Sequence, residues 1–188
     1  EQLASLRAIP GLTVIRPAEA NETRAAWKIA VERKKPVALV LTRQKLTTLD
    51  ENEYSIQAGV PHGAYVLKDD KTGQPQIILL ATGSEVEICL KASEILHEQG
   101  IKVRLVSMPS WELFEEQPEK YRHSVLPKGV PVLSVEAGIT MGWSKYTGTR
   151  GASLGIDHFG ASGPGPTVME KFGFTAQNVA ARAASLIK

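Results

Sequence analysis

The stretch "VALVLTRQ" (residues 37–44) decides the fold class of this chain. It begins with an unbroken apolar run, which ends at Thr42 and Arg43. Such a run is typical of a parallel β-strand that is covered on both faces, rather than of a strand with one face in water. We therefore expect residues 36–42 to form a deeply buried strand, followed directly by a strongly basic side chain.

The preceding residues add a second strand and a helix. The stretch "LTVIRP" (12–17) predicts a strand that stops at Pro17, and residues 21–33 carry apolar side chains at helical spacing. A strand, a helix and a strand in succession form the unit that joins two parallel strands. The chain is thus predicted to belong to the α/β class.

Residues 45–62 interrupt this pattern. They are polar, show little periodicity, and end with Gly59 and Pro61. Because a composition of this kind is typical of connections between domains, we interpret residues 45–62 as a linker.

The alternation of strands and helices resumes after residue 62. Residues 64–68 and 76–82 have the composition of two strands, and the turn-forming residues 69–74 between them predict a hairpin. The other predicted elements are strands at 101–109, 130–138 and 151–157, a helix that opens with a capping box of Ser84 and Glu87 and ends near Gly100, a helical region at 110–127 divided by Pro118, a capping box of Thr167 and Glu170, and a closing helix at 176–187.

The two parts of the chain differ in how much core they could build. Residues 1–44 supply too few elements to bury two nearly continuous apolar strands, so we interpret them as the incomplete edge of a parallel-sheet domain whose other strands precede Glu1. Residues 63–188 offer about five strands and about four helices, enough for a complete small α/β domain with a mostly parallel five-stranded sheet. The chain does not begin with methionine, and we expect it to be a piece of a longer protein.

Composition argues against several classes of function. The 188 residues are 43% hydrophobic and 22% charged, and 22 basic residues against 20 acidic residues leave a net charge of +2, which gives no basis for nucleic-acid binding. No apolar run approaches the roughly 20 residues that a membrane-spanning helix requires. The single cysteine, Cys89, cannot form a disulfide within the chain, which favours a reducing compartment, and we predict the cytoplasm.

Arg43 is the main candidate for a binding residue. In an open parallel sheet, ligands bind beyond the carboxyl ends of the strands, and Arg43 directly follows one such end. Its guanidinium is permanently charged and offers a planar fork of donors to a phosphate or a carboxylate. The alternative is that Arg43 pairs with a nearby acid or with backbone carbonyls, and its position alone favours this alternative. Arg16, at the end of the 12–17 strand, carries the same ambiguity.

Other polar motifs give weaker signals. The turn at residues 81–85 could bind an anion at a helix N-terminus, but it holds a single glycine, and an ordinary capped turn is the better interpretation. Glu136 could be an acid in a site, or it could pair with Lys145 or Arg150, which we favour. The histidines lack metal-ligand spacing, and we expect the tryptophans and the cysteine to pack in the core. These residues are His62, His97, His123 and His158, Trp27, Trp111 and Trp143, and Cys89.

Several stretches, taken together and in this order, resemble transketolase from its pyrimidine-binding domain to its C-terminus. They are "EQLASLRAIPGLTVIRPAEANET" (1–23), "PVALVLTRQ" (36–44), "ATGSEVEICL" (81–90), "VSMPSWELFEEQPEKYRHSVLP" (106–127), "SVEAGITMGW" (134–143) and "IDHFGASGPGPTVMEKFGFTAQNV" (156–179). The resemblance implies that residues 1–44 end the pyrimidine-binding domain, that residues 45–62 are a linker, and that residues 63–188 are the C-terminal domain.

The resemblance implies an activity and a role for Arg43. Transketolase moves a two-carbon ketol unit from a ketose phosphate to an aldose phosphate, and the full-length enzyme is a homodimer that uses thiamine diphosphate and Mg²⁺ (or Ca²⁺). Arg43 stands in the family's "LTRQ" motif, whose arginine contacts the phosphate of the sugar substrate. The resemblance therefore makes Arg43 a predicted substrate-binding residue, which position alone did not.

The resemblance also implies what this chain lacks. The family's "DGPTHQP" motif, its cofactor-activating acid and its metal ligands would lie upstream of Glu1. We therefore expect no catalytic, cofactor-binding or metal-binding residue here, no bound cofactor, and no turnover by the chain alone. Two alternatives stay open: a fragment of a deoxyxylulose-phosphate synthase or of a dehydrogenase β-subunit, and a non-catalytic α/β module that binds a partner or a regulatory ligand.

Overall fold

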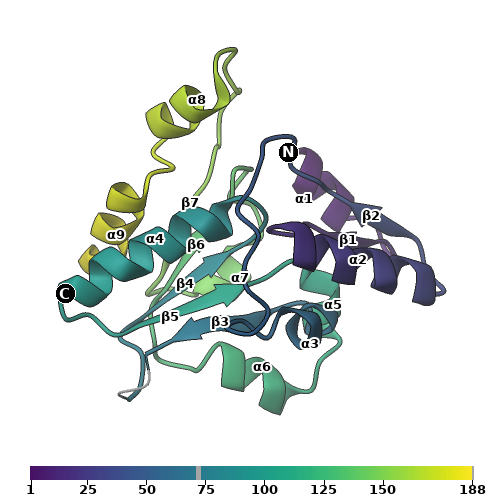
Figure 1. Cartoon of the computed structure of the whole chain (residues 1–188), viewed down its shortest axis with the longest axis horizontal. Coiled ribbons are helices and arrows are strands. Elements are labelled where there is room, and N and C mark those ends of the chain that lie inside the picture. Colours follow the sequence, from purple (N-terminus) through teal and green to yellow (C-terminus); the bar gives the residue numbers. More distant parts are fainter. Residues whose placement is uncertain (71–72, 188) are drawn as a thin grey trace.

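The computed structural model describes residues 1–70 and 73–187, and its first 40 residues form a small parallel sheet (Figure 1). Two strands pair in parallel and a helix connects them, as the strand–helix–strand prediction required. The strands are shorter than predicted. The elements are α1 (Gln2–Arg7), β1 (Thr13–Ile15), α2 (Ala20–Glu32) and β2 (Val37–Leu39).

The larger sheet has five strands, which are β3 (Tyr65–Asp69), β4 (Ile77–Ala81), β5 (Val103–Ser107), β6 (Val132–Val135) and β7 (Ala152–Leu154). Their order across the sheet is β3-β5-β4-β6-β7, and only β3 runs antiparallel to its neighbour. The prediction of a mostly parallel five-stranded sheet is confirmed.

The predicted hairpin of β3 and β4 is wrong. Strand β3 pairs with β5, and β5 separates it from β4. Every residue of β4 is buried, so this strand belongs in the middle of the sheet with a neighbour on each side, whereas β3 has exposed and half-buried positions that suit an edge. Part of the predicted turn, residues 71–72, lies outside the described residues.

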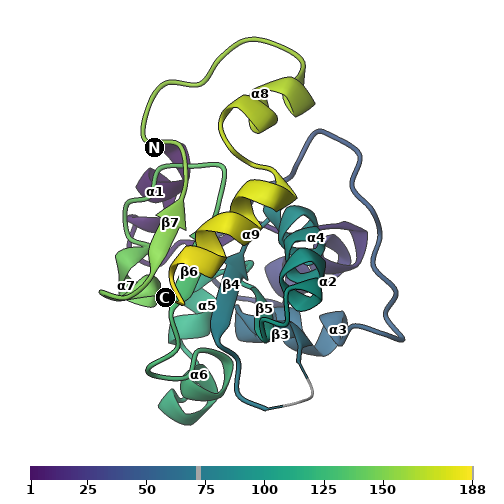
Figure 2. The same ribbon diagram turned by 90° about the vertical axis from the view of Figure 1, so that its left-hand side faces the viewer.

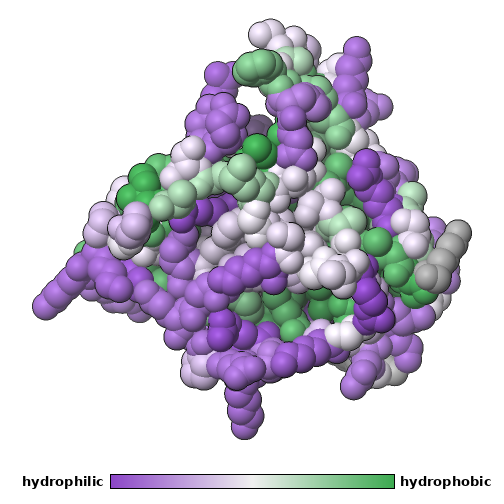
Figure 3. Space-filling view, turned by 180° about the vertical axis from the view of Figure 1, so that it is seen from behind, coloured by the Kyte–Doolittle hydropathy of each residue, from purple (hydrophilic) through white to green (hydrophobic). Residues whose placement is uncertain are grey.

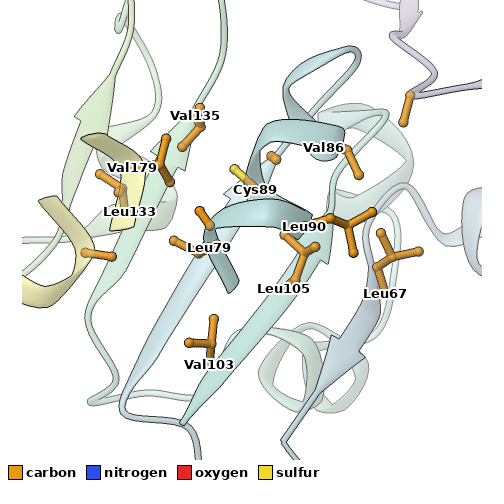
Figure 4. Close-up of a cluster of buried hydrophobic side chains, with 14 of the residues drawn as sticks. Leu67, Leu79, Val86, Cys89, Leu90, Val103, Leu105, Leu133, Val135 and Val179 are labelled. Atoms are coloured by element: carbon orange, nitrogen blue, oxygen red, sulfur yellow. The ribbon is translucent and has the colours of Figure 1, made fainter. Parts of the chain in front are cut away.

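Helices cover both faces of the larger sheet (Figure 2). Alternate residues of β4 divide between the faces: Leu79 packs under α4 and α9, whereas Ile78 and Leu80 pack toward α5, α6 and α7. Figure 4 shows the first of these clusters, in which Cys89 is fully buried as predicted. The helices are α4 (Glu85–Glu98), α5 (Trp111–Glu115), α6 (Glu119–Val125), α7 (Ser144–Thr147) and α9 (Ala176–Ser185).

The helix boundaries agree with the sequence only in part. Gly100 follows α4 with φ +75°, and Pro118 separates α5 from α6, both as predicted. Neither predicted capping box forms: Ser84 donates to the neighbouring Glu85 carboxylate, and Thr167 lies inside α8 (Gly165–Lys171). Residues that the sequence analysis did not single out cap the helices instead, namely Glu19 on α2, Ser110 on α5 and Thr175 on α9.

The small sheet is less buried than predicted. All three residues of β2 are only partly buried, Trp27 on α2 is 56% exposed, and Val31 is 81% exposed. Hydrophobic side chains accordingly reach the surface on the side of the molecule that holds this sheet (Figure 3). Helices α1 and α5 contact β1, whose three residues are all buried, so it is β2 and α2, rather than β1, that leave apolar side chains partly or largely exposed. Trp143, by contrast, is buried as predicted.

Two further segments complete the fold. Helix α3 (Ile56–Gly59) and a 3₁₀ turn (Val60–His62) fall within the predicted linker, where Ile56 and Val60 are fully buried in the main core. Helix α8 projects away from the sheet and contributes no buried residue (Figure 1). Among the described residues, no helix combines the length and the apolar character needed to cross a membrane.

Candidate functional site

Arg43 lies in an exposed segment shortly after the carboxyl end of β2. Within residues 1–70 and 73–187, no ion pair or side-chain hydrogen bond holds its guanidinium. The structure therefore places Arg43 beyond a strand end, where a parallel sheet presents its binding residues, and leaves its donors available.

A cleft of about 650 Å³ begins at the residue after Arg43. Gln44 and Leu46 form one wall, the first turns of α4 form the floor, and residues around α8 form the other wall. The segment that carries Arg43 thus borders a concave surface large enough for a small metabolite.

Arg16 does not belong to this site. Its Nη1 donates to the backbone oxygen of Thr82 at 2.8 Å and to Oε2 of Glu85 at 2.5 Å, and the side chain is almost completely buried. The turn at residues 81–85 wraps closely around the guanidinium, because a Cβ on Gly83 would lie 2.6 Å from the central carbon of Arg16. Arg16 and this turn are therefore structural, the interpretation that the sequence favoured for the turn.

Glu136 has a different partner from the one expected. Arg7 forms a two-pronged ion pair with it, with both N–O distances at 2.8 Å, and Nε1 of Trp143 donates to it at 2.9 Å. Lys145, one of the expected partners, pairs with Glu115 instead. Sequence could not indicate the pairing with Arg7, because the two residues lie 129 positions apart.

The environment of Glu136 lowers its pKa. Burial alone would raise the pKa of this carboxyl, but the hydrogen bond and charge of Arg7 and the charge of Arg16 outweigh burial and hold the pKa below its ordinary value of 4.5. The ionised carboxylate therefore stabilises the folded chain.

We expect the Glu136→Gln variant to lose about 1.5–3 kcal/mol of unfolding free energy at neutral pH, since a hydrogen-bonded charge is removed. A group with a lowered folded-state pKa contributes its stability above its ordinary pKa and loses it as the pH falls through the lowered value. The gap between the unaltered chain and the variant should thus narrow below pH 4.5. Urea unfolding at a series of pH values measures the difference in unfolding free energy between the unaltered chain and the variant. A difference that does not depend on pH would contradict the prediction.

A buried carboxyl that the sequence analysis missed also lies between the two sheets. Glu22, in the first turn of α2, accepts hydrogen bonds from Tyr65 Oη at 2.8 Å, Ser107 Oγ at 2.5 Å and the backbone N–H of Ala18 at 2.7 Å. Burial raises the pKa of Glu22, and these donors offset the rise only in part. A polar residue at a helix start usually faces water, so nothing in the sequence distinguished Glu22 from an ordinary first-turn acid.

The described residues bring together no group of three or more His, Cys, Asp or Glu side chains that could hold a metal ion. The histidines lie in separate places. His62 stacks on Tyr121, and His158 packs edge-on against Phe172.

Comparison with known proteins identifies the family. The model of the transketolase-like TK C-terminal domain matches residues 63–175. The chain belongs to the transketolase family. The model of the transketolase pyrimidine-binding domain matches residues 1–48, a range that includes Arg43.

Individual transketolases are similar over the whole chain. The protein from Geobacillus stearothermophilus is 52% identical over 189 residues, which cover 100% of this chain and 28% of that transketolase. The solved structure of transketolase from Leishmania mexicana is 41% identical, with a TM-score of 0.91 over 100% of this chain and 27% of the other. A Pichia stipitis transketolase in complex with sedoheptulose-7-phosphate is 45% identical, with a TM-score of 0.90 over 98% of this chain and 26% of the other. The chain thus spans little more than a quarter of the length of these transketolases.

Proposed function

We propose that this chain is the C-terminal portion of a transketolase, an enzyme that transfers a two-carbon ketol unit from a ketose phosphate to an aldose phosphate in pentose phosphate or Calvin-type carbon metabolism. The match of both domain models, in the order in which they occur along the chain, supports this proposal over a synthase fragment or a non-catalytic module. The division into residues 1–44, 45–62 and 63–188 is part of the same proposal.

The single observation that carries a role in substrate binding is the position of Arg43. Its guanidinium is exposed, follows the carboxyl end of β2, and is unpaired among the residues that the structure describes. An arginine fork matches the geometry of a phosphate group with two parallel charge-assisted hydrogen bonds. We assign to Arg43 the task of holding the sugar phosphate, so that the reacting end of the sugar points toward the site of chemistry.

The cofactor and the metal ion belong to the same proposal. Thiamine diphosphate and Mg²⁺ (or Ca²⁺) would be held by other segments of the complete enzyme, since the described residues gather no set of metal ligands. When bound, thiamine diphosphate would supply carbanion stabilisation for the transfer of the two-carbon unit. The complete enzyme is proposed to be a cytoplasmic homodimer that takes sugar phosphates as substrates, and this chain alone is proposed to be inactive.

We expect the Arg43→Ala variant of the complete enzyme to lose about 10- to 100-fold in kcat/KM for phosphorylated sugars, since one charge-assisted contact to the phosphate disappears. Turnover of a ketol donor without a phosphate should hardly change. Steady-state kinetics with both donors test this, with Lys45→Ala as the neighbouring charge control. An equal loss with both donors would instead show that Arg43 acts on the fold or on the cofactor.

A further inference from the structure

A second cavity, of about 450 Å³, is open to solvent. Helix α6, the loop at residues 126–130, helix α7 and the loop at residues 148–150 line it. It shares no lining residue with the cleft beside Gln44. Figure 3 views the molecule from the side of these helices, where hydrophilic residues are prominent.

Positive charge dominates the walls of this cavity. Four permanently basic side chains face two carboxylates, Glu115 and Glu119. Glu115 is already engaged, because it accepts from Nη1 of Arg122 at 2.7 Å and pairs with Nζ of Lys145 at 3.0 Å. The four basic residues are Arg122, Lys128, Lys145 and Arg150.

Lys128 and Arg150 are the cations without a carboxylate. Both are exposed, and neither forms an ion pair within residues 1–70 and 73–187. A hypothetical Cβ on Gly129 would lie 3.6 Å from Nη2 of Arg150, so the two loops bring the Arg150 guanidinium next to the loop that carries Lys128. An anion in the cavity would meet two charges that nothing else neutralises.

The Tyr146 ring closes one side of the cavity, where it packs against Trp111 at 5.3 Å and Trp143 at 6.0 Å between ring centroids. Burial raises the pKa of Tyr146, and the nearby Glu115 carboxylate, which accepts a hydrogen bond from its hydroxyl, raises it further. Glu115 is thus taken up by Arg122, Lys145 and Tyr146, and it does not neutralise Lys128 or Arg150.

We infer that this cavity binds a small phosphorylated metabolite, as a site separate from Arg43. A phosphate group supplies several acceptor oxygens and a double negative charge, which match the two cations, Lys128 and Arg150, that no carboxylate neutralises. The inference does not depend on the assignment of Arg43.

Titration with inorganic phosphate and with ribose 5-phosphate tests the inference on the 188-residue chain, at constant ionic strength, by calorimetry and by backbone amide NMR. We expect saturable binding, with shifts confined to residues 119–130 and 145–150, and tighter binding of the ester. The double variant Lys128→Gln/Arg150→Gln should bind at least about 10-fold more weakly, as two charge-assisted contacts are lost. The matched double variant Lys28→Gln/Arg182→Gln, which removes one exposed lysine and one exposed arginine elsewhere, should bind normally.

A second measurement separates binding from folding. Lys128 and Arg150 are both exposed, so the melting temperature of their double variant without ligand should stay close to that of the unaltered chain, while the gain on adding ribose 5-phosphate should shrink. The inference is overturned if neither ligand saturates, if the two double variants bind equally, if the shifts fall elsewhere, or if inorganic phosphate binds as tightly as the ester, which would indicate an adventitious ion only.

Discussion

The Arg16→Ala variant is expected to lose about 3–5 kcal/mol of unfolding free energy, because it leaves a buried carboxylate without its cation. Glu85 is completely buried and receives the guanidinium at 2.5 Å, and Glu136 lies 3.8 Å from the same nitrogen. Urea unfolding of the variant and of the unaltered chain measures the difference. A loss of this size would be a large part of the stability of an ordinary domain.

Two controls distinguish an unpaired charge from a general loss of packing. The Arg24→Ala variant removes the exposed partner of Glu51 and should cost less than about 1 kcal/mol. The double variant Arg16→Met/Glu85→Gln, which removes both charges, should be more stable than Arg16→Ala although it changes more atoms. A double variant less stable than the single one would show that the ion pair itself stabilises the fold.

The Gly63→Ala variant is expected to cost about 3–5 kcal/mol, as two effects combine. Gly63 has φ +78°, a conformation that costs a residue with a side chain roughly 1–2 kcal/mol. The added Cβ would also lie 2.2 Å from the backbone nitrogen of Phe114 and 2.5 Å from the carbonyl oxygen of Ser110. Neither is the end of a flexible side chain, so the start of α5 would have to move.

Gly100 supplies the matched control for this prediction. It has nearly the same conformation, φ +75°, but a Cβ there would meet no atom within 4 Å. The Gly100→Ala variant should therefore show the conformational cost alone, roughly 1–2 kcal/mol. Equal losses in the two variants, measured by chemical unfolding, would mean that the close approach at Gly63 relaxes without cost.

The larger sheet could be predicted well from the sequence, because each of its central strands corresponds to a short apolar run that is visible in the sequence. The apolar runs that became β4, β5 and β6 are separated by helical stretches, and this alternation by itself favours a parallel sheet. The predicted hairpin is wrong because strand pairing is not a local property. Strand β4 is buried throughout and needs a neighbour on each side, so β5 lies between β4 and β3 although β3 and β4 follow each other in the sequence. The Ser84 pattern predicted the start of α4 correctly, but the capping bond does not form, because the Ser84 hydroxyl donates to Glu85 instead. The Thr167 pattern is wrong in position, because α8 already begins at Gly165.

Only those features of the candidate site that depend on a short stretch of sequence could be predicted. The position of Arg43 after a parallel strand could be derived from "VALVLTRQ", although that strand is less buried than the run suggested; its role in holding a phosphate came from resemblance and stays a prediction. Arg16 pairs with Glu85 69 positions away, Glu22 with Ser107 85 positions away and Glu136 with Arg7 129 positions away, and no local pattern indicates such pairs. The pKa shifts of these side chains depend on the same contacts, so they could not be predicted from the sequence either.

The pairing of Arg7 with Glu136 has a consequence for the order of events during synthesis. The ribosome completes Arg7 well before it reaches Glu136, which lies 129 codons later. Until then the guanidinium lacks the carboxylate that it binds in the folded chain. The ion pair that ties α1 to the end of β6 can therefore form only after the ribosome has made most of the larger sheet, which makes the docking of these two parts a late event of synthesis.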